Sequence, residues 1–483
     1  MERRAFLAQG TSATAFVLAA GLGAPGLASV LTNEKPSRGS DIVGLSKRIA
    51  GGIYLPGAPD YERLRRGYAA KIDLHPAVIA HCTSADDVRA AVIFAKTNGM
   101  PLAVRCGGHG CAGYSACDGG LVIDLSGLRH VEVDRNAMTV RVGGGALVGD
   151  IDRATAAIGA ATMLGQCPSV GVGGLALGGG VGFLVNKFGM ACDNIESVDL
   201  VLADGRSVIA SARENVDLFW AIRGGGGNFG VATSLTMRMH SVTQVLAGNL
   251  IYRMDGFLTL MRMYREFVAT APDELTLLSV ITAGPDGKPL FVVQPCYCGD
   301  FSAGERALSE LRKSEYLVAD TVKVRDYLSV QSDIPADVPA TMAENRAGFL
   351  PEMTDAAIEM LGSALAKTPA AFTISLVHFH GAQTRVPIEA TAFPLRQRGF
   401  LYGITADWHA PSDRDFSTNW VDDLANRLGA SSIGSYVNVM DRESGEAVRA
   451  AYGPNYARLA KIKSRYDPSN LFALNQNIKP AVR

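Results

Sequence analysis

Residues 165–182 read GQCPSVGVGGLALGGGVG, a run in which eight of eighteen residues are glycine and Cys167 stands near the start. Each glycine loses more backbone entropy on ordering than alanine would, so the run alone predicts neither a stable helix nor a stable strand. Glycine at this density is typical of a main chain that passes very close to a flat or charged group. The stretch therefore predicts a ligand-binding loop, with the Cys167 side chain directed at the same ligand.

Residues 171–176, GVGGLA, also fit the dinucleotide fingerprint G-x-G-x-x-G/A, and Glu196 follows at about the expected 20 residues. That fingerprint requires an apolar strand before it and a helix after it. Here the preceding residues contain Pro168 and no β-branched run, and three consecutive glycines follow at 178–180. A Rossmann NAD site is therefore disfavoured.

Residues 104–110, VRCGGHG, form a second glycine-rich segment. Gly107 and Gly108 allow successive backbone N–H groups to turn inward and form a nest of the kind that binds a pyrophosphate. His109 lies within this nest. A histidine in one glycine loop and Cys167 in a distant one favour a single shared cofactor over two unrelated sites.

These motifs resemble those of the berberine-bridge-enzyme-like FAD-linked oxidases of the vanillyl-alcohol-oxidase superfamily. The pattern R-x-G-G-H implies that His109 bonds the flavin 8α-methyl group, and G-x-C-P-x-V-G-x-G-G implies that Cys167 bonds flavin C6. The resemblance continues through residues 193–194, 203–205, 217–230 and 452–472, and so covers most of the chain after about residue 70. It implies bicovalently bound FAD.

The resemblance also implies an α+β fold, with a PCMH-type FAD-binding domain in two parts. A substrate domain follows, built on an antiparallel sheet backed by helices. The cofactor-binding residues implied are His109, Cys167, Arg105, Cys106, Gly107, Gly108, Gly110, Tyr114, Ser115, Gln166, Val170, Gly171, Gly173, Gly174, Gly180, Gly230 and Gln476.

The change in sequence pattern near residue 245 divides the chain into an FAD-binding domain over 35–245 and a substrate domain over 246–450. For the last segment, 451–483, the resemblance implies that the chain returns to the FAD domain. Alternating apolar residues predict substrate-domain strands over 275–282, 290–297, 371–380 and 400–408. Helical periodicity predicts helices over 257–269, 305–313 and 355–366. In the FAD domain, Ser84 is expected to cap a helix that runs to Thr97.

The N-terminus predicts a targeting segment. Arg3 and Arg4 precede an apolar run from Ala13 to about Val30 that is rich in alanine and glycine and has small residues near Ala28. This is typical of a twin-arginine signal peptide, residues 1–28, and predicts a periplasmic or secreted protein without stable membrane association after cleavage. A membrane anchor is the alternative, although the run is only marginally long enough to span.

Composition limits the partners. The 483 residues carry a net charge of −1, so there is no basic surplus for nucleic acid. No residue spacing suggests a metal, because His378 and His380 lack a visible third ligand. In an oxidising compartment disulfides can form, but spacing does not decide whether they do among Cys82, Cys106, Cys111, Cys117, Cys192, Cys296 and Cys298.

Oxygen access is predicted beside the cysteine loop. In the family, small side chains at the positions of Gly165 and Val170 leave room for O2, whereas larger ones favour dehydrogenases. The expected enzyme is therefore an oxidase that reduces O2 to hydrogen peroxide. Leu175 stands where many members have histidine, which removes one usual hydrogen bond near the reduced flavin.

The catalytic base is the weak point of the resemblance. Many members show Y-x-N-Y where this chain has Tyr436, Asn438 and Val439, so the tyrosine base is missing. On an extended strand Tyr436 and Asn438 would lie on the face opposite Val439, so Tyr436 replaces that base only with a changed geometry. Tyr402 and His378, on the predicted substrate-domain strands, are the other candidates.

The function expected is the FAD-dependent oxidation of an alcohol, or of an activated C–H or C–N bond, in a small organic or natural-product substrate. A carbohydrate oxidase is the alternative within enzymes. A flavin-binding protein without turnover is the alternative from another class, and the loss of the tyrosine base at Val439 supports it.

Overall fold

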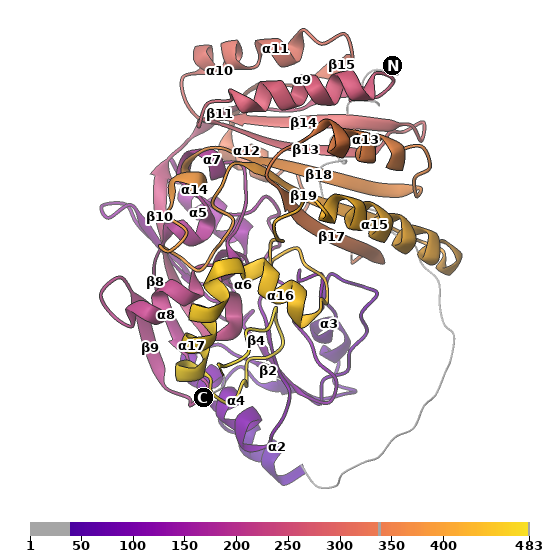
Figure 1. Ribbon diagram of the computed structural model, residues 1–483. Helices are drawn as coiled ribbons and strands as arrows, with labels where there is room; N and C mark the ends of the chain where they lie inside the picture. The colour runs from indigo at the N-terminus through magenta and orange to yellow at the C-terminus, as the bar shows by residue number, and fades with distance from the viewer. Residues whose placement is uncertain (1–38, 337–339, 482–483) are drawn as a thin grey trace.

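The computed structural model describes residues 39–336 and 340–481. The predicted signal peptide, 1–28, lies outside the described residues. Figure 1 shows two halves, a lower one formed by two sheets and an upper one formed by a single large sheet with helices on its outer side. The fold is α+β with antiparallel sheets backed by helices, as the sequence predicts.

The first sheet of the lower half holds the strand that leads into the histidine loop. Its order is β1 (Ile53–Tyr54), β2 (Val78–His81), β4 (Leu121–Asp124), β3 (Leu102–Arg105), with β2, β4 and β3 parallel. The helices beside it are α2 (Gly39–Ser46), α3 (Tyr61–Arg65) and α4 (Ala85–Thr97). Ser84 caps α4 as expected, since its side chain accepts a hydrogen bond from the Asp87 N–H.

The second sheet is antiparallel and supports the cysteine loop. Its order is β5 (Val131–Asp134), β6 (Thr139–Gly143), β10 (Val231–Ser241), β8 (Ile195–Val201), β9 (Ser207–Ser211), with β7 (Ala160–Thr162) also paired to β10. The helices packed around it are α5 (Val148–Ala156), α6 (Val172–Gly178), α7 (Val185–Phe188), α8 (Val216–Ile222) and the 3-10 turns η2 (Ala191–Asn194) and η3 (Gly226–Asn228).

Helix α6 corrects the expectation that the glycine run forms no helix. Val172, Ala176 and Leu177 are buried in the main core, and this burial stabilises a helix that intrinsic propensity disfavours. Gly173 faces the second sheet, where a Cβ would lie 2.8 Å from the Gly144 oxygen. The helix ends at Gly179, whose φ of 138° is a value that favours glycine.

The upper half is one antiparallel sheet of nine strands. Its order is β15 (Leu317–Asp320), β12 (Leu250–Arg253), β14 (Pro289–Tyr297), β13 (Leu275–Ala283), β18 (Ala371–Phe379), β19 (Gly399–Asp407), β17 (Ala343–Leu350). The short strands β11 (Gln244–Ala247) and β16 (Lys323–Asp326) pair with each other, and β11 also pairs with β14. The remaining helices and 3-10 turns up to residue 429 are α9 (Phe257–Ala269), α10 (Phe301–Ala307), α11 (Ser309–Arg312), α12 (Tyr327–Gln331), α13 (Asp355–Ala364), α14 (Ala382–Arg385), η4 (Pro411–Asp413) and α15 (Arg414–Gly429).

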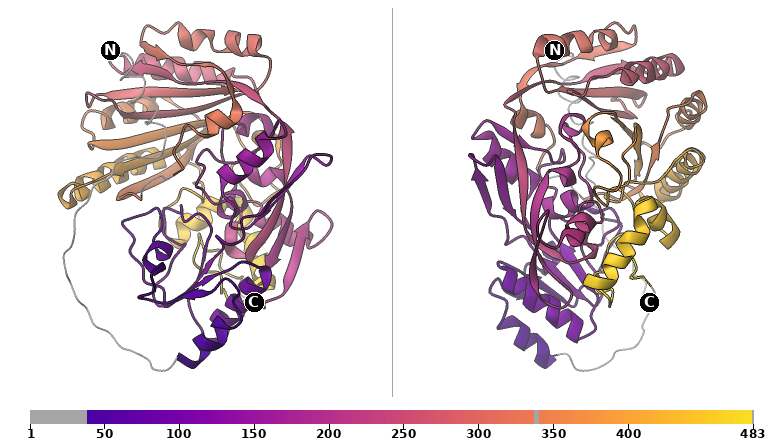
Figure 2. Two further views of the ribbon diagram at one scale, coloured as in Figure 1. Left: turned by 180° about the vertical axis from the view of Figure 1, so that it is seen from behind. Right: turned by 60° about the vertical axis from the view of Figure 1, so that its left-hand side comes forward.

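The two faces of this sheet have different partners. On β18, Phe372, Ile374 and Leu376 pack in a core with α9, α13 and α15, whereas Thr373 and Ser375 face the lower half. The alternation follows from the two-residue period of a strand. Helices cover the outer face in all three views (Figures 1 and 2), which leaves the inner face as the roof of a pocket.

Two expected elements differ from the structure. The helix expected over 305–313 is interrupted at Leu308, between α10 and α11. Residues 436–439 form a turn, not the extended strand considered in the sequence analysis. The Val439 N–H donates to the Tyr436 backbone carbonyl at 3.0 Å.

The last segment of the chain packs on the lower half. It consists of α16 (Gly445–Tyr452), η5 (Gly453–Asn455), α17 (Tyr456–Tyr466) and an irregular tail. The fully buried Lys463 ammonium donates to the carbonyls of Asn228 and Phe472 and pairs with Asp467 at 2.7 Å. A buried charge held by three acceptors fixes this segment firmly, since the loss of one partner would leave the charge uncompensated.

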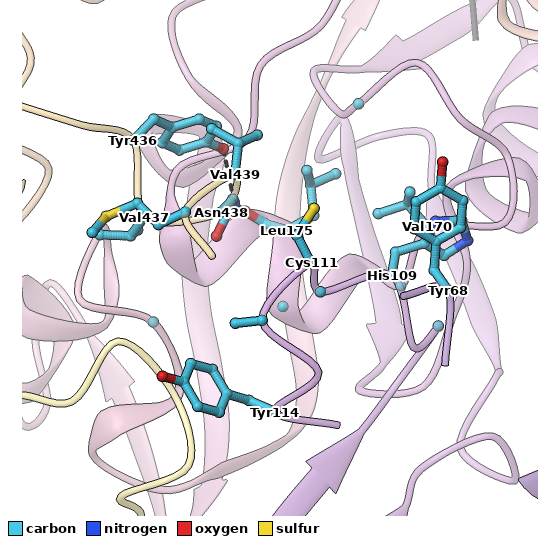
Figure 3. A pocket seen from close by; sticks show the side chains of 18 of the residues that line it. Tyr68, His109, Cys111, Tyr114, Val170, Leu175, Tyr436, Val437, Asn438 and Val439 are labelled. Carbon is cyan, nitrogen blue, oxygen red and sulfur yellow. Dashed lines mark hydrogen bonds between the residues drawn. The ribbon is translucent and has the colours of Figure 1, made fainter. Parts of the chain in front are cut away.

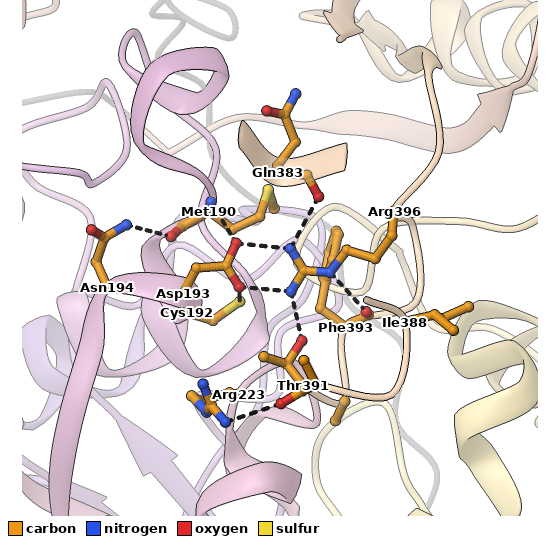
Figure 4. A network of polar contacts seen from close by, with 12 residues as sticks. Met190, Cys192, Asp193, Asn194, Arg223, Gln383, Ile388, Thr391, Phe393 and Arg396 are labelled. Atoms are coloured by element: carbon orange, nitrogen blue, oxygen red, sulfur yellow. Dashed lines mark hydrogen bonds and ion pairs between the residues drawn. The ribbon is translucent and has the colours of Figure 1, made fainter. Parts of the chain in front are cut away.

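A second buried ion pair joins the halves. Arg396, in the loop before β19, makes a two-point contact with Asp193 at 2.8 and 2.7 Å, and it also donates to Thr391 (Figure 4). Paired hydrogen bonds between a guanidinium and a carboxylate fix both position and orientation. Since Asp193 follows the glycine run, this contact holds the run against the upper half.

Candidate active site

A cavity of about 500 Å³ separates the inner face of the large sheet from the lower half. Both glycine loops line it from below, and β13, β17, β18 and β19 line it from above. The turn 436–439 and the C-terminal tail close it at the sides. In Figure 3, Tyr68 and His109 stand on one side of the cavity, the turn 436–439 on the other, and Leu175 between them.

The two glycine loops touch backbone to backbone. A Cβ on Gly107 would lie 2.7 Å from the Ser169 oxygen and still closer to the Gly171 nitrogen. A Cβ on Gly171 would lie 2.7 Å from the Cys106 Cβ. Real side chains essentially never approach so closely, so both positions require glycine. The contact brings His109 and Cys167, which are distant in sequence, to one cavity.

The histidine loop presents unengaged backbone donors. Within the described residues, the N–H groups of Gly108, His109 and Gly110 donate no hydrogen bond to the protein. Gly108 has a φ of 72°, a conformation that turns successive N–H groups toward one side. Such a nest suits a phosphate or pyrophosphate oxygen.

His109 lies in a largely apolar setting. Its ring stacks on that of Tyr68, with centroids 5.2 Å apart and planes 17° apart. Burial, together with the nearby Arg105 guanidinium, lowers the pKa of His109 to about 4. The imidazole is therefore neutral at physiological pH, which leaves a nitrogen lone pair free to react with an electrophile. Tyr68 was not predicted, because a lone tyrosine in the entry segment carries no pattern.

Cys167 lies at the head of the other loop, with its sulfur 3.3 Å from the Ser169 hydroxyl. Gly165 and Val170 flank it and also line the cavity. A Cβ on Gly165 would lie 3.1 Å from Leu175 Cδ2, so the Leu175 side chain occupies the space beside this glycine. The space that the sequence predicts for O2 beside Gly165 is therefore partly filled by the Leu175 side chain.

Tyr436 is held by the glycine run. Its hydroxyl oxygen accepts hydrogen bonds from the Gly180 N–H at 2.6 Å and from Asn438 Nδ2 at 2.7 Å (Figure 3). The same amide donates to the Leu175 carbonyl at 2.9 Å. Burial raises the pKa of Tyr436 above its ordinary value. These hydrogen bonds hold the turn 436–439 against α6. Both described partners of the Tyr436 hydroxyl are groups of the protein itself.

The other two candidates for the base face the wrong side of the sheet. His378 does not line the cavity. Its ring packs on Phe400 with centroids 4.7 Å apart and lies beside His380, with the two Nδ1 atoms 3.1 Å apart. The Tyr402 strand position borders the cavity, but its ring packs in the core between sheet and helices. This packing does not favour the expectation that either side chain contacts substrate, because the even-numbered residues of β18 and β19 point outward.

Most of the predicted cofactor residues border this one cavity. The cavity-lining members are His109, Cys167, Cys106, Gly107, Gly108, Gly110, Tyr114, Ser115, Gln166, Val170, Gly171, Gly173, Gly174, Gly230 and Gln476. Two predicted residues lie behind the lining. Arg105 donates to the Arg66 carbonyl, and Gly180 donates to Tyr436.

The donor and acceptor set fits an FAD-sized ligand. The C-terminal tail places Asn475 and Gln476 on the cavity, and the oxygens Asn475 Oδ1 and Gln476 Oε1 are buried without a partner among the described residues. Buried carbonyl oxygens are rarely left unpaired, so they point to a ligand with donors, such as a flavin or adenine ring. The backbone nest supplies the complementary donors for a pyrophosphate.

All eight cysteines are free thiols, including those for which pairing was undecided. Within residues 39–336 and 340–481, no group of three His, Cys, Asp or Glu side chains could hold a metal ion. In the same ranges, no helix is long and apolar enough to cross a membrane.

The two-part lower half, the roofing sheet and the shared cavity fit an FAD-dependent oxidoreductase. Comparison with known families agrees with this. Residues 76–211 match the FAD binding domain family, and residues 435–479 match the berberine and berberine-like family. The chain belongs to the berberine-bridge-enzyme-like family of FAD-linked oxidoreductases.

Three comparisons illustrate the relationship. The chain is 31% identical over 454 residues to (R)-6-hydroxynicotine oxidase of Paenarthrobacter nicotinovorans, covering 89% of this chain and 97% of that one. The crystal structure of 6-hydroxy-D-nicotine oxidase from Arthrobacter nicotinovorans superposes with a TM-score of 0.83 at 27% identity, over 90% and 98% of the two chains. Xylooligosaccharide oxidase from Myceliophthora thermophila, in complex with xylobiose, has a TM-score of 0.82 at 26% identity, over 92% and 100%.

The loop contact gives a test of the fold. Gly107→Ala forces a methyl group to 2.7 Å from the Ser169 oxygen and should lower the free energy of unfolding by about 1–3 kcal/mol, the usual cost of overpacking. Gly110→Ala is the matched control in the same loop, because nothing lies within 4 Å of its Cβ. Denaturant unfolding of both variants measures the difference. Equal stability of the two would show that the loops do not depend on this contact.

Proposed function

We propose that this protein is an exported oxidase that carries FAD bound covalently through His109 and Cys167. It oxidises an alcohol or an activated C–H or C–N bond of a small organic substrate by two electrons and reduces O2 to hydrogen peroxide. The observation that carries the proposal is the contact of the two glycine loops, because it places one nucleophilic side chain from each loop on the same cavity.

The chain's own residues supply attachment and positioning. The neutral His109 imidazole and the Cys167 thiol are the two nucleophiles, and the stacked Tyr68 ring limits how His109 turns. When bound, FAD supplies the two-electron acceptor. The backbone nest at 108–110 would hold the pyrophosphate, and the unpaired Gln476 Oε1 would accept a hydrogen bond from the cofactor.

A carbohydrate oxidase is the second candidate. Hydroxyl and amide side chains line the roof, where Thr405 Oγ1 donates to Asn345 Oδ1 at 2.7 Å and Thr373 and Ser375 lie alongside on β18. Such groups suit sugar hydroxyls, and the related xylooligosaccharide oxidase supports this reading.

The substrate class is tested by anaerobic mixing of the holoenzyme with panels of alcohols, secondary amines and oligosaccharides. Flavin bleaching identifies the class that reduces the enzyme. The proposal predicts bleaching by at least one panel, followed by stoichiometric peroxide on admission of air. Substrate binding without bleaching would instead favour a flavin-binding protein without turnover.

Covalent attachment is tested on a denaturing gel. The acid-denatured protein should retain flavin fluorescence on the polypeptide. His109→Ala and Cys167→Ala should each leave one linkage, and the double variant should release the flavin. Cys111→Ala is the matched control, because this thiol also lines the cavity but has no predicted bond to flavin. Free flavin from the unmodified protein would contradict the proposal.

Oxygen access is tested at Val170 and Gly165. Each of the variants Val170→Leu and Gly165→Val should slow reoxidation of the reduced holoenzyme by about tenfold. The Cβ of the Gly165→Val variant also lies 3.1 Å from Leu175 Cδ2. A tenfold change corresponds to about 1.4 kcal/mol of barrier, which a steric block can supply. Reduction by substrate, measured in the same stopped-flow instrument, should change far less. Reoxidation at the original rate in both variants would place the O2 path elsewhere.

Export is tested by changing both arginines of the predicted signal to lysine. The double variant Arg3→Lys/Arg4→Lys should accumulate as precursor in the cytoplasm, because the twin-arginine pathway recognises that pair. Cell fractionation and the size of the protein on a gel give the measurement. An unchanged periplasmic yield would argue for another export route.

A further inference from the structure

A second cavity lies behind the cysteine loop. It encloses about 250 Å³ and is formed by α5, the first residue of β7, the two residues after β10, the end of β16 and the start of α12. Its lining residues are Asp152, Thr155, Ala156, Ala160, Val242, Thr243, Asp326, Tyr327 and Leu328. The volume exceeds the roughly 10–15 Å³ that one water molecule requires, so an ion with part of its hydration shell fits.

Two buried residues that line this cavity carry a polar atom with no protein partner. Asp152 is 4% exposed, and its Oδ1 has no hydrogen-bond partner among the described residues. The Tyr327 hydroxyl, on a side chain that is also 4% exposed, has none either. Nearly all buried polar groups in native proteins are paired, so two such oxygens on residues of one cavity indicate a missing ligand.

The charge of the lining indicates a cation. Asp152 and Asp326 are the charged residues on the cavity, and no basic side chain lines it. Arg153, the nearest cation in sequence, has a 64% exposed side chain that pairs with Asp150. Burial raises the pKa of Asp152 to about 7, opposed by a hydrogen bond from Gln331 and by Arg153. An added positive charge would stabilise this carboxylate.

The oxygen set favours one positive charge over two. Asp152 is the one buried carboxylate, since Asp326 is exposed and accepts a hydrogen bond from Gln244. Divalent ions such as Mg²⁺ and Ca²⁺ are usually bound by several carboxylates or by ordered octahedral water. The single negative charge of the buried Asp152 carboxylate, beside the neutral Tyr327 hydroxyl, matches the charge of a monovalent cation.

Gln331 links this cavity to the flavin cavity. Its Nε2 donates to Asp152 Oδ2 at 3.0 Å and to the Gly165 carbonyl at 2.9 Å. Gln331 is 1% exposed, so its amide has little freedom to turn away. Any shift of the Asp152 carboxylate therefore reaches the backbone that lines the flavin site beside Cys167.

We propose that this cavity binds a small monovalent cation, an alkali ion or ammonium, against Asp152 and Tyr327, and that Gln331 transmits its presence to Gly165. The site is separate from the catalytic cavity, and its existence does not depend on the substrate or on covalent flavin attachment.

The test uses the holoprotein at pH 8.5 and constant ionic strength, with choline chloride replaced stepwise by NaCl, KCl or NH4Cl. The unfolding temperature should rise to a plateau with at least one small cation, because a ligand that binds the folded state stabilises it. The flavin absorption band should shift over the same concentration range. A separate titration with MgCl2 should give no saturable rise.

Two variants locate the site. Asp152→Asn should weaken the apparent affinity for the cation at least tenfold. Tyr327→Phe should weaken it by a smaller factor without harming folding, because the hydroxyl makes no hydrogen bond to the described protein. Asp415→Asn removes the same charge from the exposed surface of α15 and should respond like the unmodified protein.

Four outcomes would overturn the proposal. No saturable rise with NaCl, KCl or NH4Cl in place of choline chloride would show that no small cation binds, and a rise with Mg²⁺ alone would contradict the assigned charge. An unchanged response in both Asp152→Asn and Tyr327→Phe would place any bound cation elsewhere. A saturable rise in unfolding temperature with an unchanged flavin band would disprove the link through Gln331.

Discussion

The close approach of two backbones at Gly107 and Gly171 is the constraint on which the site depends. One glycine belongs to the loop after β3, and the other directly precedes α6, which rests on the antiparallel sheet. Because neither position tolerates a Cβ, the two loops meet here through main chain alone. Main chain changes shape less than side chains do, so the reactive residues of each loop are held in a fixed relation.

Two further buried contacts carry this constraint to the rest of the molecule. The Arg396–Asp193 pair holds η2 to the loop before β19, and the N–H groups of Ala191 and Cys192 in η2 donate to the carbonyls of Gly180 and Gly179. The Tyr436 hydroxyl accepts a hydrogen bond from the Gly180 N–H. The glycine run is thereby held by this loop and by the turn 436–439, despite a composition that disfavours order. The flexibility expected of such a sequence is removed by its neighbours.

Much of this architecture could be predicted from the sequence, because its signals are local. Alternation located the strands of the large sheet, and glycine density located both loops. Alternation could not decide which face of β18 looks into the cavity, since both faces are buried, and His378 was therefore assigned to the wrong side. Helix α6 and the turn at Tyr436 were missed because tertiary packing decides them. Tyr68 and Gln331 lie in no motif and became visible only through their contacts.

The C-terminal tail has a consequence for the biogenesis of the protein. Phe472, Leu474, Asn475 and Gln476 form part of the cavity wall, and the buried Lys463 holds them against Asn228. These residues follow the other cavity walls in the chain, so a ribosome synthesises the other walls first. The cavity therefore closes only after this segment has been made and has folded against Asn228. Until then the groove is open along one side, and that open side is a route by which a bulky dinucleotide can enter.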